Sequence, residues 1–444
     1  MLRRFTTASL AIGGLLVGLS TPSLYGQELI ETAPTGSSVL AEPVHFAEPA
    51  PSVAAQQAIE YEMTDCMQGC CPPSRGGWFV EGWLEQGYTA NADHPASNFN
   101  GPLGFNDRAD EYQMNQLYLT FGKDIIRDGS AWDIGFRTDV LYGTDYFFLQ
   151  SRGLELDQAG NQDWNGDGPR NAGAAALYGL ALPQAYAEVH VPVGSGLTAK
   201  VGHFYSILGY EAATAPDNFF YSHSYTYVYG EPKTHTGFLL SYNPTDCLTV
   251  QAGMTNGWDH FENVTDNTHG FLFGTRWAND VASLSYSMHT GPEDPAGDQN
   301  RYLHSLVYTR QLGYRWNYAM QHDYGVQEDA FLTLGGSEDA MYYTLSQYLY
   351  YQWSDELAFG GRFEWFRDED NSRIQQLPIE GLYSGSNYYN VTLGANWKPC
   401  QHVLVRPEAR YDWSDLNPAG ATGVFNDFQD DHMWTFAVDV ILYF

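Results

Sequence analysis

The sequence predicts an all-β fold, a transmembrane antiparallel up-and-down β-barrel of about sixteen strands. Three observations predict it: segments that alternate apolar and polar residues, connections that alternate in length, and a strand-forming composition. The 444 residues include 32 Tyr, 24 Phe and 45 Gly, and only 17% of them are charged. Aromatic residues favour strands and glycine favours tight turns. One closed sheet can hold several hundred residues, so a single barrel accounts for the length.

The alternation is clearest in residues 132–142, where apolar residues at even positions interleave with Asp133, Arg137 and Asp139. Successive strand residues point to opposite faces, so one face of this segment is apolar and the other is charged. We count sixteen such segments, near 77–88, 111–122, 131–142, 182–192, 197–208, 234–242, 248–258, 270–277, 281–290, 301–311, 314–324, 340–353, 356–367, 386–397, 402–413 and 432–444.

The connections between these segments are short and long in turn. Short turns of the kind seen at 278–280 and 312–313 are separated by long gaps such as 143–181 and 209–233. This is the pattern of bacterial outer-membrane barrels, and an even strand number places both chain ends on the periplasmic side. A soluble β-sandwich is the alternative, but it explains neither this regularity nor aromatic residues at strand ends. Those residues are Trp83, Trp277, Tyr314, Trp353, Trp397 and Trp413.

The formal net charge of −32 excludes a generic nucleic-acid-binding protein, which needs a basic face. It also argues against electrostatic docking on anionic lipid. Hydrophobic residues make up 43% of the chain and aromatic residues 15%, so we expect disorder only in the N-terminal extension.

Residues 1–26 are expected to form a secretory signal peptide, with a basic start and an apolar run, Ala8–Leu19, too short to span a bilayer as a helix. Residues 27–76 are rich in Ala, Pro, Glu and Ser and predict a flexible periplasmic linker. No later segment predicts a transmembrane helix. Residues 77–444 therefore carry the barrel, which we expect in the cell outer membrane, in contact with its lipid.

Five cysteines are predicted to form disulfides rather than a zinc site, because the linker cluster has no neighbouring His and the compartment is oxidising. Cys66, Cys70 and Cys71 end the linker, and Cys247 and Cys400 fall in short turns about eight strands apart. The last two are too far apart to bond each other. We hypothesise that each bonds the linker cluster and ties the linker beneath the barrel.

The last strand, Met433–Phe444, carries an apolar row at its even positions from Trp434 to Phe444. This row is predicted to face lipid, and Asp439 to face the lumen. The strand must pair with the first one, because an open edge in lipid leaves backbone groups unsatisfied. Its terminal aromatic residue also looks like the signal read by the barrel-assembly machinery, which is therefore an expected partner.

Several stretches resemble the OmpL-like family of β-barrel porins. They are Gly82–Tyr88, Phe105–Arg108, Asn115–Leu119, Ala181–Glu188, Lys200–Tyr205, Ala215–His223, Tyr229–Pro232 and Thr234–Gly237. The resemblance implies an outer-membrane porin, a water-filled channel for passive diffusion of small polar solutes or ions. It brings no catalytic residues, and no enzyme activity is expected. The alternative functions are a structural or adhesive barrel and a barrel-type lipase. The sequence leaves open whether the barrel forms a homo-oligomer.

A barrel of this size is about 30 Å wide, so wall side chains do not fill it and a water channel is expected. Inward-facing charged residues would then line the pore. The alternative is that these charges pair across strands and stabilise the wall, and we expect both. The predicted pore-lining residues are Arg137, Asp139, Glu188, Lys200, Arg362, Glu364, Arg406, Glu408, Arg410 and Asp412.

The segment 209–233 is long and aromatic and carries Glu211, Asp217 and Glu231. We hypothesise that it folds into the lumen, narrows it and faces the basic wall, so that a transverse field selects solutes by charge and dipole. An outward surface loop is the alternative.

Asp163, Asn165 and Asp167 match the first half of an EF-hand calcium loop. The twelfth position is Ala174, where the motif requires Glu, and an acidic surface loop produces such a run as well. Calcium in a surface loop is thus the one cofactor that the sequence offers. A barrel-type lipase needs a Ser–His pair on one face of the wall. Ser305 and His304 are adjacent in the sequence and therefore point to opposite faces, so they do not suit this role.

Overall fold

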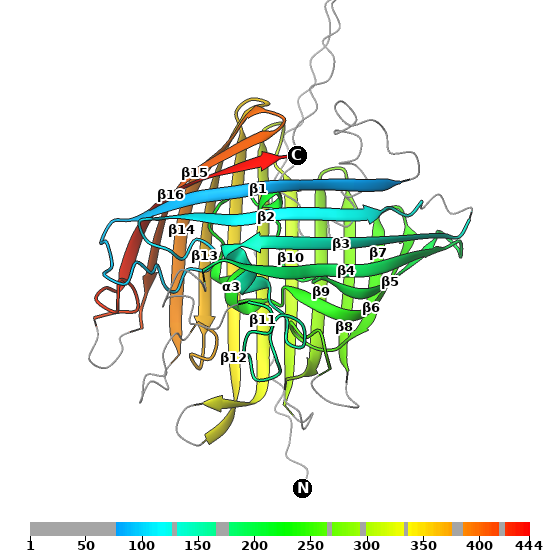
Figure 1. Cartoon of the computed structure of the whole chain (residues 1–444), viewed down its shortest axis with the longest axis horizontal. Coiled ribbons are helices and arrows are strands. Elements are labelled where there is room, and N and C mark those ends of the chain that lie inside the picture. Colours follow the sequence, from blue (N-terminus) through cyan, green and yellow to red (C-terminus); the bar gives the residue numbers. More distant parts are fainter. Residues whose placement is uncertain are drawn as a thin grey trace, which may run out of the picture. The chain divides into compact units, whose positions relative to one another are not determined.

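The computed structural model describes the barrel and most of its loops (Figure 1). The predicted signal peptide and linker, with Cys66, Cys70 and Cys71, lie outside the described residues. The described ranges are 77–126, 131–165, 177–263, 269–293, 299–332, 336–374, 385–416 and 422–444, with side chains undescribed at 331–338.

The sixteen predicted strands are all present and form a closed barrel in which each strand pairs antiparallel with its neighbours in sequence. Strand β1, blue in Figure 1, pairs with the C-terminal strand β16 and closes the sheet. The strands are β1 Trp78–Asn91, β2 Glu111–Lys123, β3 Asp133–Gly143, β4 Gly179–Val191, β5 Leu197–Tyr205, β6 Thr234–Thr245, β7 Leu248–Thr255, β8 Gly270–Asn279, β9 Ala282–Pro292, β10 Asn300–Gln311, β11 Trp316–Leu332, β12 Gly336–Gln352, β13 Leu357–Asp368, β14 Ser386–Cys400, β15 Val403–Ser414 and β16 His432–Tyr443.

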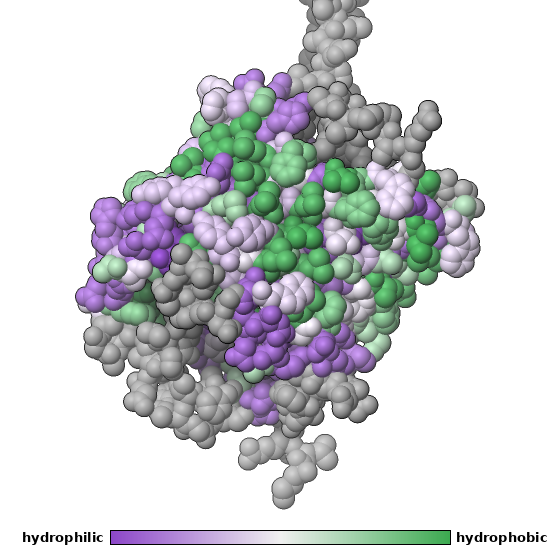
Figure 2. Space-filling view, in the orientation of Figure 1, coloured by the Kyte–Doolittle hydropathy of each residue, from purple (hydrophilic) through white to green (hydrophobic). Residues whose placement is uncertain are grey.

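The two faces of the barrel wall differ in polarity as the alternation predicts. On β16, Trp434 and Phe436 are 43% and 53% exposed on the outer face, whereas Asp439 is buried in the lumen. The predicted register of the last strand is confirmed. Figure 2 shows hydrophobic residues gathered over the strands of the visible face and hydrophilic residues toward the loops. No helix in the described part of the chain is long and apolar enough to cross a membrane.

The outer face leads to a first prediction. Val438→Arg places a charge near the middle of β16, on the exposed side, and should destabilise the barrel by about 2–4 kcal/mol in a lipid bilayer. Asp431→Arg, at an exposed position before β16, is the control and should cost less than about 1 kcal/mol. Urea unfolding in lipid vesicles measures both. Equal losses would show that Val438 does not face lipid.

Most of the strand-end aromatic residues lie on the outer face, but the prediction for Trp83 is wrong. Trp83 faces the lumen, since odd positions of β1 point inward, and it is 8% exposed. Its ring stacks on Tyr118 with 4.1 Å between centroids, and its indole N–H donates to Gln116. An inward partner for the indole N–H satisfies a tryptophan as well as an interface does.

Among the described residues, three chain segments inside the barrel pack against one another. Two are the loop after β1, which contributes Phe105, and the 3₁₀ helix η1, Thr144–Leu149. The third is residues 206–233 between β5 and β6, which we call the lumenal loop. It contains the 3₁₀ helix η3, Ala215–Asp217, and the α-helix α3, Tyr225–Gly230. Aromatic side chains from all three segments pack together in one buried cluster.

Candidate functional site

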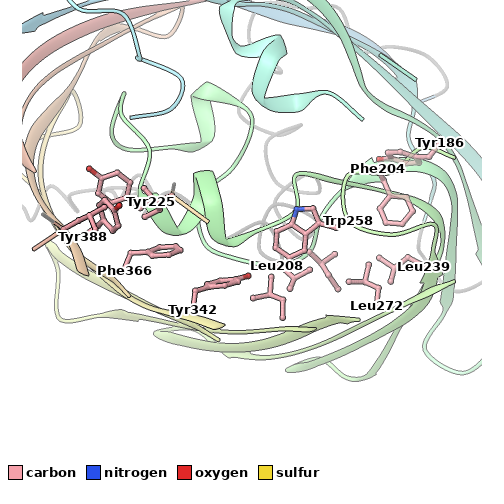
Figure 3. Packing of buried hydrophobic residues seen from close by; sticks show 14 residues of the cluster. Tyr186, Phe204, Leu208, Tyr225, Leu239, Trp258, Leu272, Tyr342, Phe366 and Tyr388 are labelled. Carbon is pink, nitrogen blue, oxygen red and sulfur yellow. The ribbon is translucent and has the colours of Figure 1, made fainter. Parts of the chain in front are cut away.

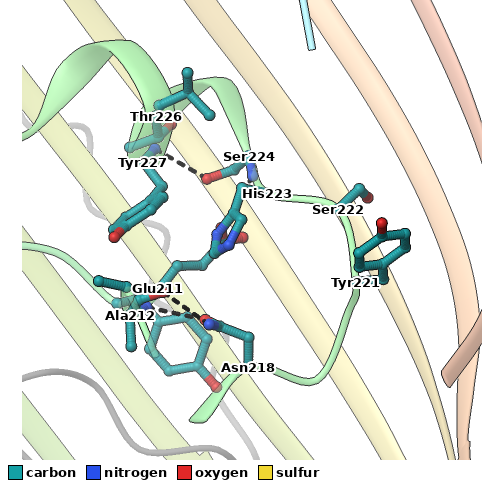
Figure 4. Close-up of polar contacts among 12 residues, drawn as sticks. Glu211, Ala212, Asn218, Tyr221, Ser222, His223, Ser224, Thr226 and Tyr227 are labelled. Atoms are coloured by element: carbon teal, nitrogen blue, oxygen red, sulfur yellow. Dashed lines mark hydrogen bonds and ion pairs between the residues drawn. The ribbon is translucent and has the colours of Figure 1, made fainter. Parts of the chain in front are cut away.

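The lumenal loop has its own local structure. The Asn218 amide bonds the N–H and C=O of Ala212, which closes a tight turn around η3 (Figure 4). Ser224 caps α3, because its hydroxyl oxygen accepts the Tyr227 N–H at 3.1 Å. The loop is therefore a folded unit that the wall can hold at fixed points.

The wall that holds it consists of inward side chains on β13 and β15, which we call the charged wall. Every second residue of these strands points inward, so the alternation places the whole set on one side of the lumen. Each member is at most 8% exposed. The set is Arg362, Glu364, Arg406, Glu408, Arg410 and Asp412.

Arg406 is the most highly connected of the three arginines. Its guanidinium bonds the Asp439 carboxylate, with a closest distance of 2.6 Å, and Glu85 at 2.8 Å. The remaining N–H groups donate to the carbonyls of Ala215 and Asn218, each at 2.8 Å. One buried cation thus joins β15, β16 and β1 to the lumenal loop.

Arg362 and Arg410 hold the loop in the same way. Arg362 donates to the Glu211 carboxylate at 3.0 Å and to the Ser222 carbonyl at 2.7 Å. Arg410 pairs with Asp412 and donates to the His223 carbonyl. Planar guanidinium groups suit this use, since their several donors serve a carboxylate and a carbonyl together.

The wall carboxylates bind backbone N–H groups of the loop. Glu408 accepts the N–H of Tyr221 at 3.0 Å, and Glu364 accepts those of Tyr225 and Thr226 at 2.8 and 2.6 Å. The last two lie in the first turn of α3, which has no partners of its own for them. Both signs of charge on the wall therefore bind loop backbone.

The other predicted pore-lining residues lie outside the charged wall. Arg137 pairs with Asp139 on β3 at 2.8 Å. Glu188 and Lys200 are opposite each other in the β4–β5 register, and the Lys200 ammonium lies 4.1 Å from the centre of the Tyr186 ring. Ion pairing thus takes up much of the predicted pore charge, as the wall-stabilising alternative expects.

The three predicted loop acids separate in the structure. Glu211 reaches Arg362 on the charged wall, while Asp217 is bonded by Thr214 within the loop. Glu231 lies against β11, where Gln321 donates to it. The three acids therefore do not form the expected row that faces the arginines of the charged wall.

The charge on Glu211 gives a pH prediction. Burial works to raise its pKa, but the Arg362 guanidinium, with His223 and the Ser224 N–H, lowers the pKa to about 2. An acid with a lowered pKa stabilises the fold above its ordinary value near 4.5, and this contribution is lost as the pH falls toward 2. We expect the conductance of the reconstituted barrel to rise between pH 4.5 and 2 as the loop loosens.

Glu211→Gln is the matched variant. It should conduct more than the parent at pH 7 and show a smaller further rise in acid. Identical acid responses in the two proteins would exclude Glu211 as the responding group.

Sequence reasoning missed several residues that hold the loop. Glu85 bonds Arg406, Gln116 bonds the Ala213 carbonyl, and the Tyr348 hydroxyl donates to Glu211. Gln321 of β11 accepts the Tyr210 N–H. Each occupies an inward position of its strand, so alternation could have placed these side chains in the lumen. Nothing local in the sequence indicates their partners.

Cofactor and disulfide predictions remain predictions. The Asn165 amide bonds the backbone of Leu180 through both its oxygen and its nitrogen, and Asp167 lies outside the described residues. The described residues contain no group of three or more His, Cys, Asp or Glu suited to a metal.

Cys247 and Cys400 are exposed thiols at short-turn ends of the barrel. Thiol labelling before and after reduction would test their link to the linker cysteines.

Solved structures of outer-membrane channels share this barrel. It is similar to the outer-membrane channel DcaP of Acinetobacter baumannii, with 10% identity, a TM-score of 0.52, and 84% of this chain and 98% of that chain covered. It is also similar to OprB of Pseudomonas putida, with 13% identity and a TM-score of 0.52, and with 88% of this chain and 97% of that chain covered. A third similar structure is an anion-selective porin from Comamonas acidovorans. It has 9% identity and a TM-score of 0.51, and 83% of this chain and 99% of that chain are covered. At such identities the likeness shows the fold alone.

Sequence comparison identifies the family. No curated protein matches the chain. A family model does match it over residues 79–444, which is the whole barrel, and is described as "Putative beta-barrel porin-2, OmpL-like". The chain therefore belongs to the OmpL-like family of outer-membrane β-barrel porins.

Proposed function

We propose that this porin passes small polar solutes and ions by passive diffusion, through a lumen that the lumenal loop narrows at a fixed position. The attachment of the loop to the charged wall is the observation that carries the proposal. Arg362, Arg406 and Arg410 all bond backbone carbonyls of the loop. Glu364 and Glu408 bond its backbone N–H groups.

These contacts fix the backbone of the loop rather than only its side chains. Buried charge-assisted hydrogen bonds are among the strongest in proteins, and several of them act together on one short segment. The loop therefore acts as part of the wall, and the width of the passage does not depend on a moving gate.

A barrel about 30 Å wide is wider than a single loop segment, and we propose that a passage remains beside the loop. Water-filled passages of this kind discriminate by size and by the polarity of their lining. The function needs no bound cofactor and no catalytic group.

A barrel-type lipase and an adhesin are the other candidates. Ser305 points into the lumen, whereas His304 points outward and bonds the Tyr286 hydroxyl, so these two side chains do not form a catalytic pair. Proteoliposomes that contain the purified barrel distinguish the three functions. A porin releases entrapped salt, an adhesin retains it, and a lipase hydrolyses the vesicle phospholipid. Retained salt with intact phospholipid would end the porin proposal.

We also propose that β16 carries the signal for barrel assembly. The Phe444 backbone pairs with Gly82 through both its N–H and its C=O, each at 3.0 Å, and its ring is 63% exposed. A Cβ added at Gly82 would collide with the Tyr118 carbonyl and with the Phe444 ring, so the close approach of these strands requires glycine at this position. Phe444→Ala should lower the folded fraction in outer membranes while purified protein still refolds in detergent. An unchanged folded fraction would refute the assembly role.

A further inference from the structure

Two buried carboxylates face each other where the lumenal loop meets β11. Glu231 lies near the end of the loop, and Asp323 points inward from the middle of β11; they are 2% and 0% exposed. The side-chain amide nitrogen of Gln321 donates to both of them, and its distance to the Asp323 carboxylate is 2.9 Å. One nitrogen atom thus bridges the pair, and the two carboxyl groups are close enough to form a hydrogen bond with each other.

The bonds to Gln321 use one oxygen of each carboxylate and leave the other oxygen without a donor. The unpaired atoms are Glu231 Oε2 and Asp323 Oδ1. Ionised carboxylates only accept hydrogen bonds, so two of them cannot bond each other. A buried acceptor without a donor is costly. A proton on one of the two groups supplies the missing donor.

The cations near the pair have other partners. Lys233 and Arg373 donate to backbone carbonyls of the lumenal loop, and Arg301 pairs with Glu293. Within the described residues, none of them forms an ion pair with either carboxylate. The charged and titratable groups around the pair are Lys233 and Tyr227 of the loop, Asp259 after β7, Arg301 of β10, His322 of β11, Tyr342 of β12 and Arg373 after β13.

The pair lies where both ends of the lumenal loop meet β11. At the start of the loop, the Tyr210 N–H donates to the Gln321 side chain at 3.0 Å. Gly209 has a φ of +86°, and a Cβ there would collide with the Glu231 carboxylate. The start and the end of the loop therefore contact the same carboxylate and the same amide.

The helix α3 leads directly into this junction. In Figure 3, Tyr342 and Phe366 lie beside α3, and their stacked rings are 5.6 Å apart. The Tyr342 hydroxyl donates to the carbonyl of Gly230, the residue before Glu231, at 2.6 Å. A change of charge at Glu231 therefore acts on the segment that joins α3 to β6.

We propose that Glu231 and Asp323 share one proton at neutral pH, and that loss of this proton in alkali releases the end of the lumenal loop from β11 and widens the passage. This inference rests on the proposed porin function and adds its regulation by pH. Two buried carboxyl groups in contact do not ionise together, because the second charge would face the first. Once both are ionised, repulsion separates Glu231 from Asp323, while the charged wall still holds the rest of the loop.

The surroundings of Glu231 support this assignment. Burial and the Asp323 carboxylate raise the pKa of Glu231 well above its ordinary value of 4.5. An acid with a raised pKa stabilises the fold less as the pH rises above its ordinary value, until the pH passes the raised value. Burial also lowers the pKa of Lys233 to about 8, so alkali removes this positive charge as well. Substitution of Asp323 separates the two events.

Asp323→Asn is the direct test, because its amide donates to Glu231 at every pH and so replaces the shared proton. The infrared difference spectrum between the parent and this variant at pH 7 should contain the C=O stretch of one protonated carboxyl group. Above the ordinary pKa of Glu231, the unfolding equilibrium constant of the parent should rise up to about tenfold more per pH unit than that of the variant. Asp431→Asn, at an exposed position, is the control and should behave as the parent does in both measurements.

Conductance provides the functional readout. The KCl conductance of the parent should rise about twofold between pH 7 and about pH 10, whereas Asp323→Asn and Glu231→Gln should keep their value at pH 7. A constant conductance in the parent, or no carboxyl band in the difference spectrum, would overturn the inference. The same alkaline rise in Asp323→Asn would assign the response to Lys233 and overturn it as well. A folded barrel without KCl conductance at any pH would instead refute the porin function, and the infrared band would still report the shared proton.

Discussion

Deleting Ala212–Ser222 should raise the single-channel conductance of the barrel in KCl by about threefold, because it removes the part of the lumenal loop that crosses the lumen. The deleted segment contains Asn218, whose carbonyl Arg406 holds, and Tyr221, whose N–H Glu408 holds. Its removal opens cross-section without changing any strand. Planar-bilayer recordings of the parent and the deletion variant measure the effect.

The control is a deletion at an exposed position. Residues 158–160 form an exposed turn closed by a hydrogen bond from the Asp157 N–H to the Asn161 carbonyl. Removing them should leave the conductance at the parent value. If the deletion of Ala212–Ser222 also leaves it there, the lumenal loop does not set the width of the passage.

Arg406→Met should be the most destabilising single substitution in the lumen. The substitution leaves the Asp439 and Glu85 carboxylates buried without their cation and removes the donor that holds Ala215 and Asn218. Breaking a buried ion pair from one side costs about 3–5 kcal/mol. We expect a loss of this size in the free energy of unfolding in lipid vesicles.

Two further variants separate this cause from a general effect of losing an arginine. Arg310→Met, at an exposed position near the end of β10, should cost less than about 1 kcal/mol. The double variant Arg406→Met with Asp439→Asn should recover part of the loss, because one unpaired charge is removed. A loss for Arg406→Met no greater than for Arg310→Met would contradict the anchoring role of Arg406.

The strands could be predicted from the sequence because alternation is a local property. Each strand must present apolar residues to lipid every second position, and Trp434, Phe436 and Asp439 show this within one short segment. Trp83 could not be placed in the same way. A tryptophan near a strand end satisfies its N–H at the membrane interface or inside the lumen, and only the partner, Gln116, decides between them.

The candidate site could be predicted only in part. Alternation places Arg362, Arg406 and Arg410 in the lumen, and the acidic aromatic loop was predicted to enter it. The pairing of these groups depends on how the sheet closes, which brings Glu85 of the first strand to Arg406 of the fifteenth. Glu231 illustrates the same limit, because its position against Gln321 follows from the path of the loop across the barrel.

The conductance of the wild-type barrel tests the central claim most directly. In planar bilayers, a water-filled porin produces stepwise increases in current whose size grows in proportion to KCl concentration. The structure predicts such steps, of one dominant size, because the charged wall fixes the lumenal loop. An absence of steps from correctly folded protein would contradict the claim.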